Sequence, residues 1–408
     1  MSILLKTKFN INIKNLGQIK SANIDFADLT LFVGPQATGK SILLQLIKLL
    51  FDGANVGNTL MKYGYNWEED ISNFNELYFG QGMRNLWSDS TKVFFNNGEV
   101  YLDTLLPHEV SEDYEHLNLF EQLFFIPAQR VLTLENGWPR SFTGFETGDP
   151  YVVRNFSEHL RLLMQQGFIN KDKDNAIFPQ VGRLGQEISD AINATIFHGA
   201  RVELNTVEMR KRIQLNVNGN LLPFMAWSAG QREFMPLLLG LYWLMPISED
   251  SKNLYAGLLD SNKLFSSFIV IEEPETGLHP RAILSVILVC LELLHRGYRL
   301  LISTHSPVLL EAIWAIRNLQ NNNSDVKYLY QLFDLKPSPP ITELFENILK
   351  NKKFSTYYFD QKEDGVEVRD ISSLDPFDED LSTADWGGLT SFSSRASEVV
   401  SQAVQDTL

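Results

Sequence analysis

The sequence is poor in cysteine, in long hydrophobic runs and in basic charge. Cys290 is the single cysteine among 408 residues, which excludes a disulfide framework and a cysteine-rich metal site. It stands in an apolar run, so we expect a buried, inert thiol. The longest candidate apolar stretch, 282–294, is too short to cross a bilayer and contains Ser285 and Glu292. The first ten residues also lack the apolar core of a signal peptide, and we therefore expect a cytoplasmic protein without a membrane segment.

The shortage of basic residues bears on partners. The chain has 35 Lys and Arg against 50 Asp and Glu, a formal net charge of −15. A polyanion such as DNA would be repelled by this charge as a whole, since DNA binding relies on Lys and Arg at the phosphates. A local basic patch and an acidic surface for a basic protein partner both stay open. The length of 408 residues suits two or three domains, and a hydrophobic content of 44% is ordinary for a folded globular protein.

What is present begins with a strand, a glycine loop and a helix in direct succession. The apolar run 29–33 leads into a match to G-x-x-x-x-G-K-[ST], and apolar residues then recur at helical spacing up to residue 50. The loop consists of Gly34, Pro35, Gln36, Ala37, Thr38, Gly39, Lys40 and Ser41. Backbone N–H groups of such a loop cradle phosphate oxygens at the positive end of a helix. We expect Lys40 to reach the β- and γ-phosphates of a nucleoside triphosphate and Ser41 to help hold Mg²⁺.

A pair of acidic residues provides the second strong signal. Glu272 and Glu273 end a continuous apolar strand predicted at 264–271. A carboxylate at this position, near the phosphate loop, can hold Mg²⁺ directly or through water. The next carboxylate can act as general base on the attacking water. We therefore assign Glu272 to the metal and Glu273 to catalysis.

Three further motifs are weak when taken singly. Ser228-Ala229-Gly230-Gln231 opens an apolar helix and forms an anion-binding helix N-terminus, although the same residues make an ordinary helix cap. His305 follows a strand at 299–302, where a structural histidine is common. Gln129 follows the buried run 123–126.

The remaining pattern predicts an α/β fold, because buried strands alternate with helices. Short strands at 8–13 and 22–26 precede the phosphate loop, and hairpins are predicted at 94–102 and 355–371. Helices are predicted at 156–166, 181–197, 233–245, 280–296, 308–319 and 392–404. We expect five regions: an ATPase lobe at 1–50, an insertion at 51–119, a strand with a helical and β lobe at 120–220, a second ATPase part at 221–320, and a hairpin with an acidic tail at 321–408.

Together and in this order, these motifs resemble the ATP-binding-cassette type ATPases of the RecF/SMC-like branch. The chain is similar to the bacterial AAA ATPases related to the overcoming-lysogenization-defect family. The resemblance rests on Gly34–Ser41, on Ser228–Gln231, on the run Glu272-Glu273-Pro274-Glu275-Thr276-Gly277-Leu278-His279-Pro280, and on Ser303-Thr304-His305-Ser306. It implies a mainly parallel sheet, an antiparallel β subdomain and a helical insertion lobe.

The resemblance also implies roles. ATP and Mg²⁺ are the expected ligands, His305 senses the γ-phosphate, and Gln129 is a Q-loop residue. Ser228, Gly230 and Gln231 belong to a signature that contacts ATP held by a second subunit. The family usually has Asp where Glu272 stands, and Trp227 and Ala229 replace the Leu and Gly typical of transporters.

Four functions follow as alternatives. The first is an ATPase switch that dimerises around ATP and controls a separate effector, a nuclease or toxin, in bacterial anti-phage defence. The second is a RecF-like repair ATPase that acts on DNA. A transporter subunit and a non-hydrolysing ATP-binding scaffold are the third and fourth.

Overall fold

The computed structural model describes residues 9–67, 70–107, 121–166, 175–180, 182–245 and 267–405. The start of the strand predicted at 264–271 and residue 181 of the predicted helix 181–197 lie outside these ranges. None of the described helices combines the length and the hydrophobicity needed to cross a membrane.

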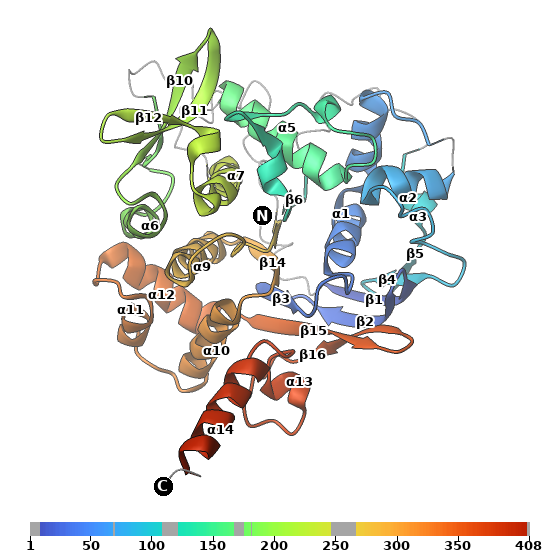
Figure 1. Cartoon of the computed structure of the whole chain (residues 1–408). Coiled ribbons are helices and arrows are strands. Elements are labelled where there is room, and N and C mark those ends of the chain that lie inside the picture. Colours follow the sequence, from blue (N-terminus) through green and yellow to red (C-terminus); the bar gives the residue numbers. More distant parts are fainter. Residues whose placement is uncertain are drawn as a thin grey trace.

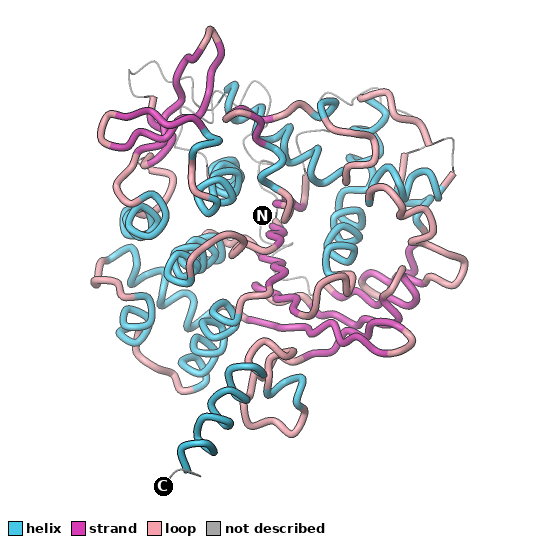
Figure 2. The backbone as a smooth tube through the Cα atoms, in the orientation of Figure 1, coloured by secondary structure: helices cyan, strands magenta, loops and turns pink. Residues whose placement is uncertain are grey.

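A large mixed sheet runs through the middle of the molecule, with helices on both sides (Figure 2). Ten of the described strands form it, in the order β5-β4-β1-β2-β16-β15-β3-β14-β13-β6. Their bounds are β1 (Asn10–Leu16), β2 (Ile19–Asp25), β3 (Leu29–Val33), β4 (Lys92–Phe95), β5 (Gly98–Val100), β6 (Leu123–Ile126), β13 (Phe268–Glu272), β14 (Arg299–Thr304), β15 (Phe354–Lys362) and β16 (Gly365–Asp370).

The two halves of this sheet differ in strand direction. β15, β3, β14, β13 and β6 are all parallel, whereas β1 pairs antiparallel with both β2 and β4. This arrangement confirms the predicted α/β class with a mainly parallel core and an antiparallel subdomain. Because the carboxyl ends of parallel strands meet at one edge, the loops after β3, β13, β14 and β6 converge there.

The C-terminal hairpin joins the two halves. β15 pairs parallel with β3, and its partner β16 pairs parallel with β2. The hairpin predicted at 355–371 therefore lies within the central sheet, next to the strand that carries the phosphate loop.

Each face of the sheet contributes to its own hydrophobic core. In β3, Leu31 and Val33 pack with helices α7 (Ala229–Leu244), α9 (Pro280–His295) and α10 (Pro307–Asn321) on one face. Phe32 points to the other face and packs with α1 (Lys40–Lys62). Every residue of β3 is buried, as expected for a strand covered on both sides. Figure 1 shows α1 on one side of the sheet and α9 and α10 on the other.

The phosphate-loop helix is longer than the sequence indicated. α1 continues past residue 50 to Lys62, with a non-helical backbone at Asp52 (φ −129°). At this kink Lys48 Nζ lies 2.8 Å from Asp52 Oδ2 and 3.0 Å from Glu121 Oε2, and all three side chains are largely buried. Asp52 also accepts from the N–H groups of Gln122 and Leu123, so the cluster ties α1 to the start of β6.

A smaller four-stranded sheet has the order β12-β11-β10-β9. It consists of β9 (Ala176–Phe178), β10 (Arg201–Val207), β11 (Arg210–Val217) and β12 (Asn220–Pro223). The β10–β11 hairpin projects from the body of the molecule (Figure 1). β12 leads through the short helix η5 (Phe224–Ala226) into α7, so this sheet lies next to the N-terminus of α7 in the chain.

The remaining elements surround these parts. They are α2 (Ile71–Phe79), α3 (Leu102–Leu105), α5 (Tyr151–Gln166), α6 (Gln186–Ile192), α11 (Lys327–Phe333), α12 (Pro339–Asn351), α13 (Leu381–Ala384), α14 (Ser391–Gln405), the short helices η2 (Arg130–Thr133), η3 (Phe142–Gly144) and η4 (Asn193–Phe197), and the strand pair β7 (Leu134–Glu135) and β8 (Trp138–Pro139). The hairpin predicted at 94–102 is confirmed as β4–β5. α11 and α12 carried no sequence prediction, and α14 projects from the body (Figure 1).

Candidate functional site

The glycine loop joins β3 to α1 and is shaped by a close approach of β15. A Cβ on Gly34 would lie 2.9 Å from the carbonyl oxygen of Phe359, and Gly34 has φ +146°. Only glycine fits there, because any side chain would collide with backbone. Gly39 then precedes α1 at φ +93°. The loop conformation is thus set both by its own glycines and by a strand from the far end of the chain.

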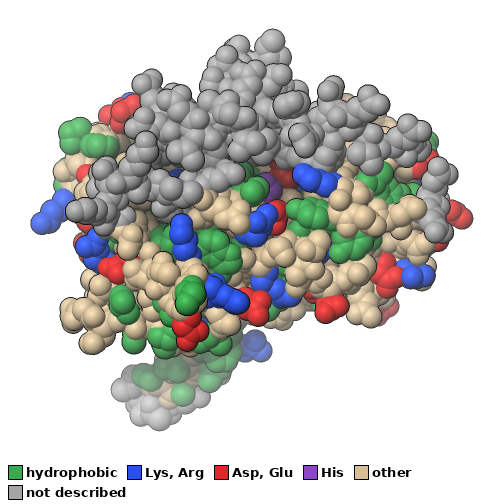
Figure 3. All heavy atoms as spheres, turned by 90° about the horizontal axis from the view of Figure 1, so that it is seen from above, with side chains coloured by type: hydrophobic (Ala, Val, Ile, Leu, Met, Phe, Trp, Pro, Cys, Tyr) green, Lys and Arg blue, Asp and Glu red, His purple; other side chains and the backbone are tan. Residues whose placement is uncertain are grey.

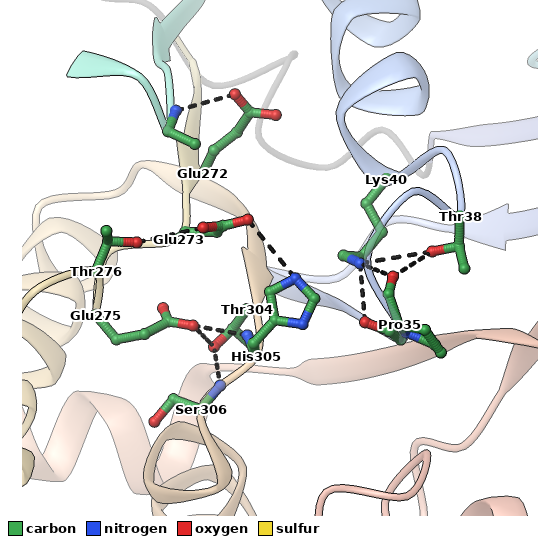
Figure 4. Close-up of polar contacts among 12 residues, drawn as sticks. Pro35, Thr38, Lys40, Glu272, Glu273, Glu275, Thr276, Thr304, His305 and Ser306 are labelled. Carbon is green, nitrogen blue, oxygen red and sulfur yellow. Dashed lines mark hydrogen bonds and ion pairs between the residues drawn. The ribbon is translucent and has the colours of Figure 1, made fainter. Parts of the chain in front are cut away.

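Lys40 lies folded over this loop (Figure 4). Its Nζ donates to the carbonyl oxygens of Gly34 (2.9 Å) and Pro35 (2.6 Å), and the Thr38 hydroxyl also donates to Pro35 (2.8 Å). Burial lowers the pKa of Lys40 to about 8, and the nearby carboxylates of Glu273, Glu272 and Glu275 oppose this shift. The loop after β3 therefore faces an acidic group of residues that follows β13.

Glu272, the last residue of β13, is buried beside the phosphate loop. Its Oε2 accepts from the N–H of Ala128 (3.1 Å). Burial raises its pKa, while a hydrogen bond from the Ser41 side chain and the one from Ala128 act in the opposite direction. Its Oε1 is buried and has no hydrogen-bond partner among the described residues. An orphaned carboxylate oxygen beside a hydroxyl suits a hard divalent cation.

This donor set fits Mg²⁺ bound together with phosphates. The described residues include no group of three or more His, Cys, Asp or Glu side chains arranged to hold a metal alone. Mg²⁺ in nucleotide sites typically takes one or two protein oxygens, with substrate phosphates and water supplying the rest. Ser41 and Glu272 are therefore the residues that would hold it.

Glu273 has an unusual backbone for a residue with a side chain. Its φ is +44°, in the left-handed region, which costs about 1 kcal/mol or more for a non-glycine residue. The conformation is held by a hydrogen bond from its N–H to Ser303 (2.9 Å) and by one from the Thr276 N–H to its carbonyl (3.1 Å). The Thr276 hydroxyl also donates to its Oε2 (3.3 Å). The carboxylate is consequently aimed at the neighbouring strand end.

His305 occupies that strand end, directly after β14. Its Nε2 lies 3.6 Å from Glu273 Oε1, and the imidazole ring is drawn between Glu273 and Lys40 in Figure 4. Burial lowers the pKa of His305, and the positive charge of Lys40 lowers it further against the opposing effect of Glu273. The lowered pKa favours the neutral ring, which has one N–H to donate.

Comparison with known families adds to this geometry. Residues 29–311 match a family model described as "AAA domain, putative AbiEii toxin, Type IV TA system". The match spans well over half of the chain. The chain belongs to this AAA-domain family.

Solved structures give weaker likenesses. An SMC head bound to the C-terminal winged-helix domain of ScpA has 10% identity and a TM-score of 0.41, with 89% of this chain and 97% of that chain covered. The SMC head domain from Thermotoga maritima has 11% identity and a TM-score of 0.35, with 89% and 98% covered. A dimeric bacterial ABC transporter cassette has 12% identity and a TM-score of 0.30, with 73% and 89% covered. A search of curated proteins finds no match. Because these TM-scores are all below 0.5, we describe the fold of this AAA domain from its own strand order and not from these likenesses.

Glu275 is a site residue of this AAA domain for which no role was predicted. Its Oε1 accepts from the Thr304 hydroxyl (2.7 Å) and from the N–H of His305 (2.6 Å). The Thr304 oxygen accepts in turn from the Ser306 N–H (2.9 Å). Burial raises the pKa of Glu275. The signal was present, since Glu275 stands in the acidic run after the strand, but its partners come from another strand.

Arg130 is the second residue that sequence reasoning missed. It is fully buried, at 0% exposure, and its guanidinium donates to the carbonyl oxygens of Glu272 (2.9 Å), Glu273 (3.1 Å) and Glu233 (3.1 Å). Its neighbour Gln129, the predicted Q-loop residue, is exposed at the start of η2. No hydrogen bond joins the Gln129 side chain to the site in the part of the chain that the structure describes.

The signature residues lie at the N-terminus of α7 and are exposed or nearly so. Ser228 caps the helix: its Oγ accepts from the Gln231 N–H (3.3 Å), and Gln231 Oε1 accepts from the Ser228 N–H (3.2 Å). A Cβ on Gly230 would lie 2.8 Å from the carbonyl oxygen of Gly277, so the helix packs closely on the loop after β13. Within the described residues, no hydrogen bond joins Ser228 or Gly230 to the phosphate loop of the same chain.

Proposed function

We propose that this AAA domain is a Mg²⁺-dependent ATPase that works as a dimeric switch. The observation that carries the proposal is the convergence of Lys40, Ser41, Glu272, Glu273 and His305 at one edge of the parallel strands. Lys40 and Ser41 come from the start of α1 after the glycine loop, Glu272 and Glu273 from the end of β13, and His305 from the end of β14. A cation for phosphate oxygens, a metal carboxylate and a general base are the groups that phosphoryl transfer to water needs.

The binding step uses the loop 34–41. Its N–H groups and the N-terminus of α1 would hold the β- and γ-phosphates, and Lys40 would leave the Gly34 and Pro35 carbonyls to reach them. Mg²⁺, held by Ser41 and Glu272, would supply charge neutralisation at the phosphate oxygens.

The hydrolytic step belongs to Glu273. Its carboxylate would accept a proton from the water that attacks the γ-phosphate. His305 would turn its one ring N–H from the side of Glu273 toward the γ-phosphate and donate to it there. Glu275 fixes the backbone of His305, so that the ring is placed before ATP arrives.

The dimeric part of the proposal rests on the signature residues. Ser228 and Gly230 are not bonded to their own phosphate loop, yet they form a helix N-terminus of the kind that binds anions. We place them against ATP held by a second copy. ATP would close two copies together, and hydrolysis would reopen them.

The switch controls a separate effector, a nuclease or toxin, in bacterial anti-phage defence. Support comes from the family description, which names a toxin and a toxin–antitoxin system, and from the resemblance of the motifs to the overcoming-lysogenization-defect ATPases.

A RecF-like role on DNA is the second candidate. One observation favours it: Arg210, Lys211 and Arg212 follow one another on the projecting β10–β11 hairpin. The net charge of −15 opposes it, and basic and acidic side chains are interspersed over the described part of the face in Figure 3. Salt-dependent DNA binding that is lost when the three residues are changed to Ser would favour the repair role.

The proposed ATPase is tested with the wild-type chain and Lys40→Ala. We expect the wild type to hydrolyse ATP only with Mg²⁺ and to dimerise with ATP, and Lys40→Ala to lose ATP binding. Phosphate release measures hydrolysis, light scattering measures dimerisation, and calorimetry measures ATP binding. Normal ATP binding by Lys40→Ala would remove the basis of the proposal.

The effector is tested separately. Copurification of a nuclease or toxin expressed from an adjacent reading frame would support it.

A further inference from the structure

Arg130 joins three segments that contribute to different parts of the proposed mechanism. It follows β6, at the start of η2, and its side chain is completely buried. Its two terminal nitrogens donate to the carbonyl oxygens of Glu272 and Glu273, and its Nε donates to the carbonyl oxygen of Glu233 in α7. One planar fork therefore fixes the end of β13 and the first turns of the signature helix relative to each other.

The backbone that Arg130 holds is the backbone that aims the catalytic carboxylate. Glu273 has a left-handed conformation, and its carbonyl oxygen accepts from Arg130 and from the N–H of Thr276. A residue in this region keeps its conformation only when its surroundings fix it. Removing the guanidinium would release one of these constraints without touching the Glu273 side chain.

The loop after β13 also packs closely on α7 at a second point, Gly277. A Cβ on Gly277 would lie 3.1 Å from Cγ of Glu233, and Gly277 has φ +74°. The Glu233 carboxyl has its pKa raised by burial, and Arg130 opposes that shift. A displacement of α7 would therefore be passed to the loop 273–277 through the Arg130 hydrogen bonds and through the close packing of Gly277 on Glu233.

We infer that Arg130 is a positioning residue that couples the signature helix of one copy to that copy's own catalytic Glu273. The inference rests on the proposed function, in which Ser228 and Gly230 of α7 touch ATP held by the second copy. ATP held by the second copy would fix the position of α7 in the first copy. Arg130 of the first copy would transmit this position to its own Glu273, which belongs to the other ATP site. Two sites that share such a link hydrolyse ATP in concert.

The test compares Arg130→Lys with a control at a second arginine that contacts the other end of α7. Arg183 is also buried, and its guanidinium donates to the carbonyl oxygens of Tyr242 (2.7 Å) and Met245 (3.2 Å) at the other end of α7. Arg183→Lys removes a buried guanidinium that holds carbonyl oxygens at the C-terminal end of α7, away from the site. Both variants keep a positive charge, and neither changes a residue proposed to touch ATP.

We expect Arg130→Lys to bind ATP and to dimerise with ATP like the wild type, with KM unchanged, while kcat falls about 10- to 100-fold, the usual effect of misplacing a catalytic group by about 1 Å. Arg183→Lys should lower the melting temperature comparably and leave kcat within about twofold of wild type at equal folded fraction. A wild-type kcat in folded Arg130→Lys, or equal losses of kcat in both variants, would overturn the positioning role.

A second variant covers the case in which Arg130→Lys does not fold. Gly277→Ala places a Cβ 3.1 Å from Cγ of Glu233 and so presses the loop 273–277 against α7, while Arg130 and its carbonyl partners keep their identities. We expect a severalfold lower kcat at unchanged KM, and a wild-type kcat would overturn the inference. If the wild-type chain itself shows no ATP turnover, the proposed function fails and the inference falls with it. If the wild type does turn over ATP, the proposed function stands and the variants test the role of Arg130 alone.

Discussion

The Nε2 atom of His305 lies 3.6 Å from Oε1 of Glu273, across the ends of two adjacent parallel strands. The proposed general base and the proposed γ-phosphate sensor are thus already in contact in the protein alone. Glu273 is directed there by its own left-handed backbone, and His305 by the hydrogen bond from its N–H to Glu275. The relationship is therefore built into the protein and does not depend on the substrate.

Glu273→Gln should separate binding from hydrolysis. The amide keeps the size of the side chain but cannot accept the proton of the attacking water, so turnover should fall about 10²- to 10⁴-fold while ATP binding persists. The ATP-bound dimer should accumulate because hydrolysis no longer reopens it. Phosphate release together with light scattering measures both effects. Retained turnover would assign the general base elsewhere.

Glu275→Ala should destabilise the protein and reduce turnover together. The change leaves the buried donors of Thr304 and His305 without an acceptor, and each unsatisfied group costs about 1–3 kcal/mol. We expect a loss of about 2–4 kcal/mol in chemical denaturation. Glu275→Gln is the matched control, because its amide oxygen can still accept both bonds, and it should stay within about 1 kcal/mol of wild type. Equal losses in the two variants would show that the charge matters and not the hydrogen bonds.

ATP affinity should decrease as the pH rises above 8. Burial lowers the pKa of Lys40 from the ordinary 10.5 to about 8, so the folded apo protein loses this charge where the unfolded chain keeps it. Folding is therefore opposed by this group below pH 8, and that penalty disappears as the pH rises toward 10.5. Phosphate binding favours the charged form, so the apparent Kd should rise roughly tenfold per pH unit above 8.

Calorimetry at pH 7 to 9.5 in buffers of different ionisation enthalpy would measure the affinity and the accompanying proton uptake. Lys40→Arg is the control, since its side chain stays charged over this range and should show a weaker but pH-independent affinity. A flat affinity in the wild type would contradict the lowered pKa.

Lys48→Met should be among the more damaging core substitutions. It leaves the carboxyls of Asp52 and Glu121 buried without their cation, which costs about 3–5 kcal/mol. Lys350 offers the comparison: it makes an ion pair of the same spacing with Glu346, at 2.7 Å, but on the surface. Lys350→Met should change stability by less than about 1 kcal/mol. Urea denaturation of both variants measures the difference, and similar losses would argue against a structural role of the buried cluster.

Local pattern was sufficient for the elements that carry the chemistry. The strand, glycine loop and helix at 29–50 are adjacent in the chain, so their hydrophobic period and glycine spacing predict them directly. The same is true of the strand that ends at Glu272. The position of Glu272 at the end of a strand predicted that it lies near the phosphate loop, whereas the placement of His305 followed from the resemblance to the ABC-type ATPases.

Only the tertiary structure decided how these elements are held. The insertion of β15 beside β3 explains why position 34 must be glycine, since the obstacle is the backbone of Phe359. Arg130 and Glu275 act by hydrogen bonds to backbone groups of distant segments, and a backbone group carries no sequence signature. The sequence by itself therefore determined which residues can do the chemistry. The fold determined which residues aim them, because aiming depends on long-range contacts that no local periodicity encodes.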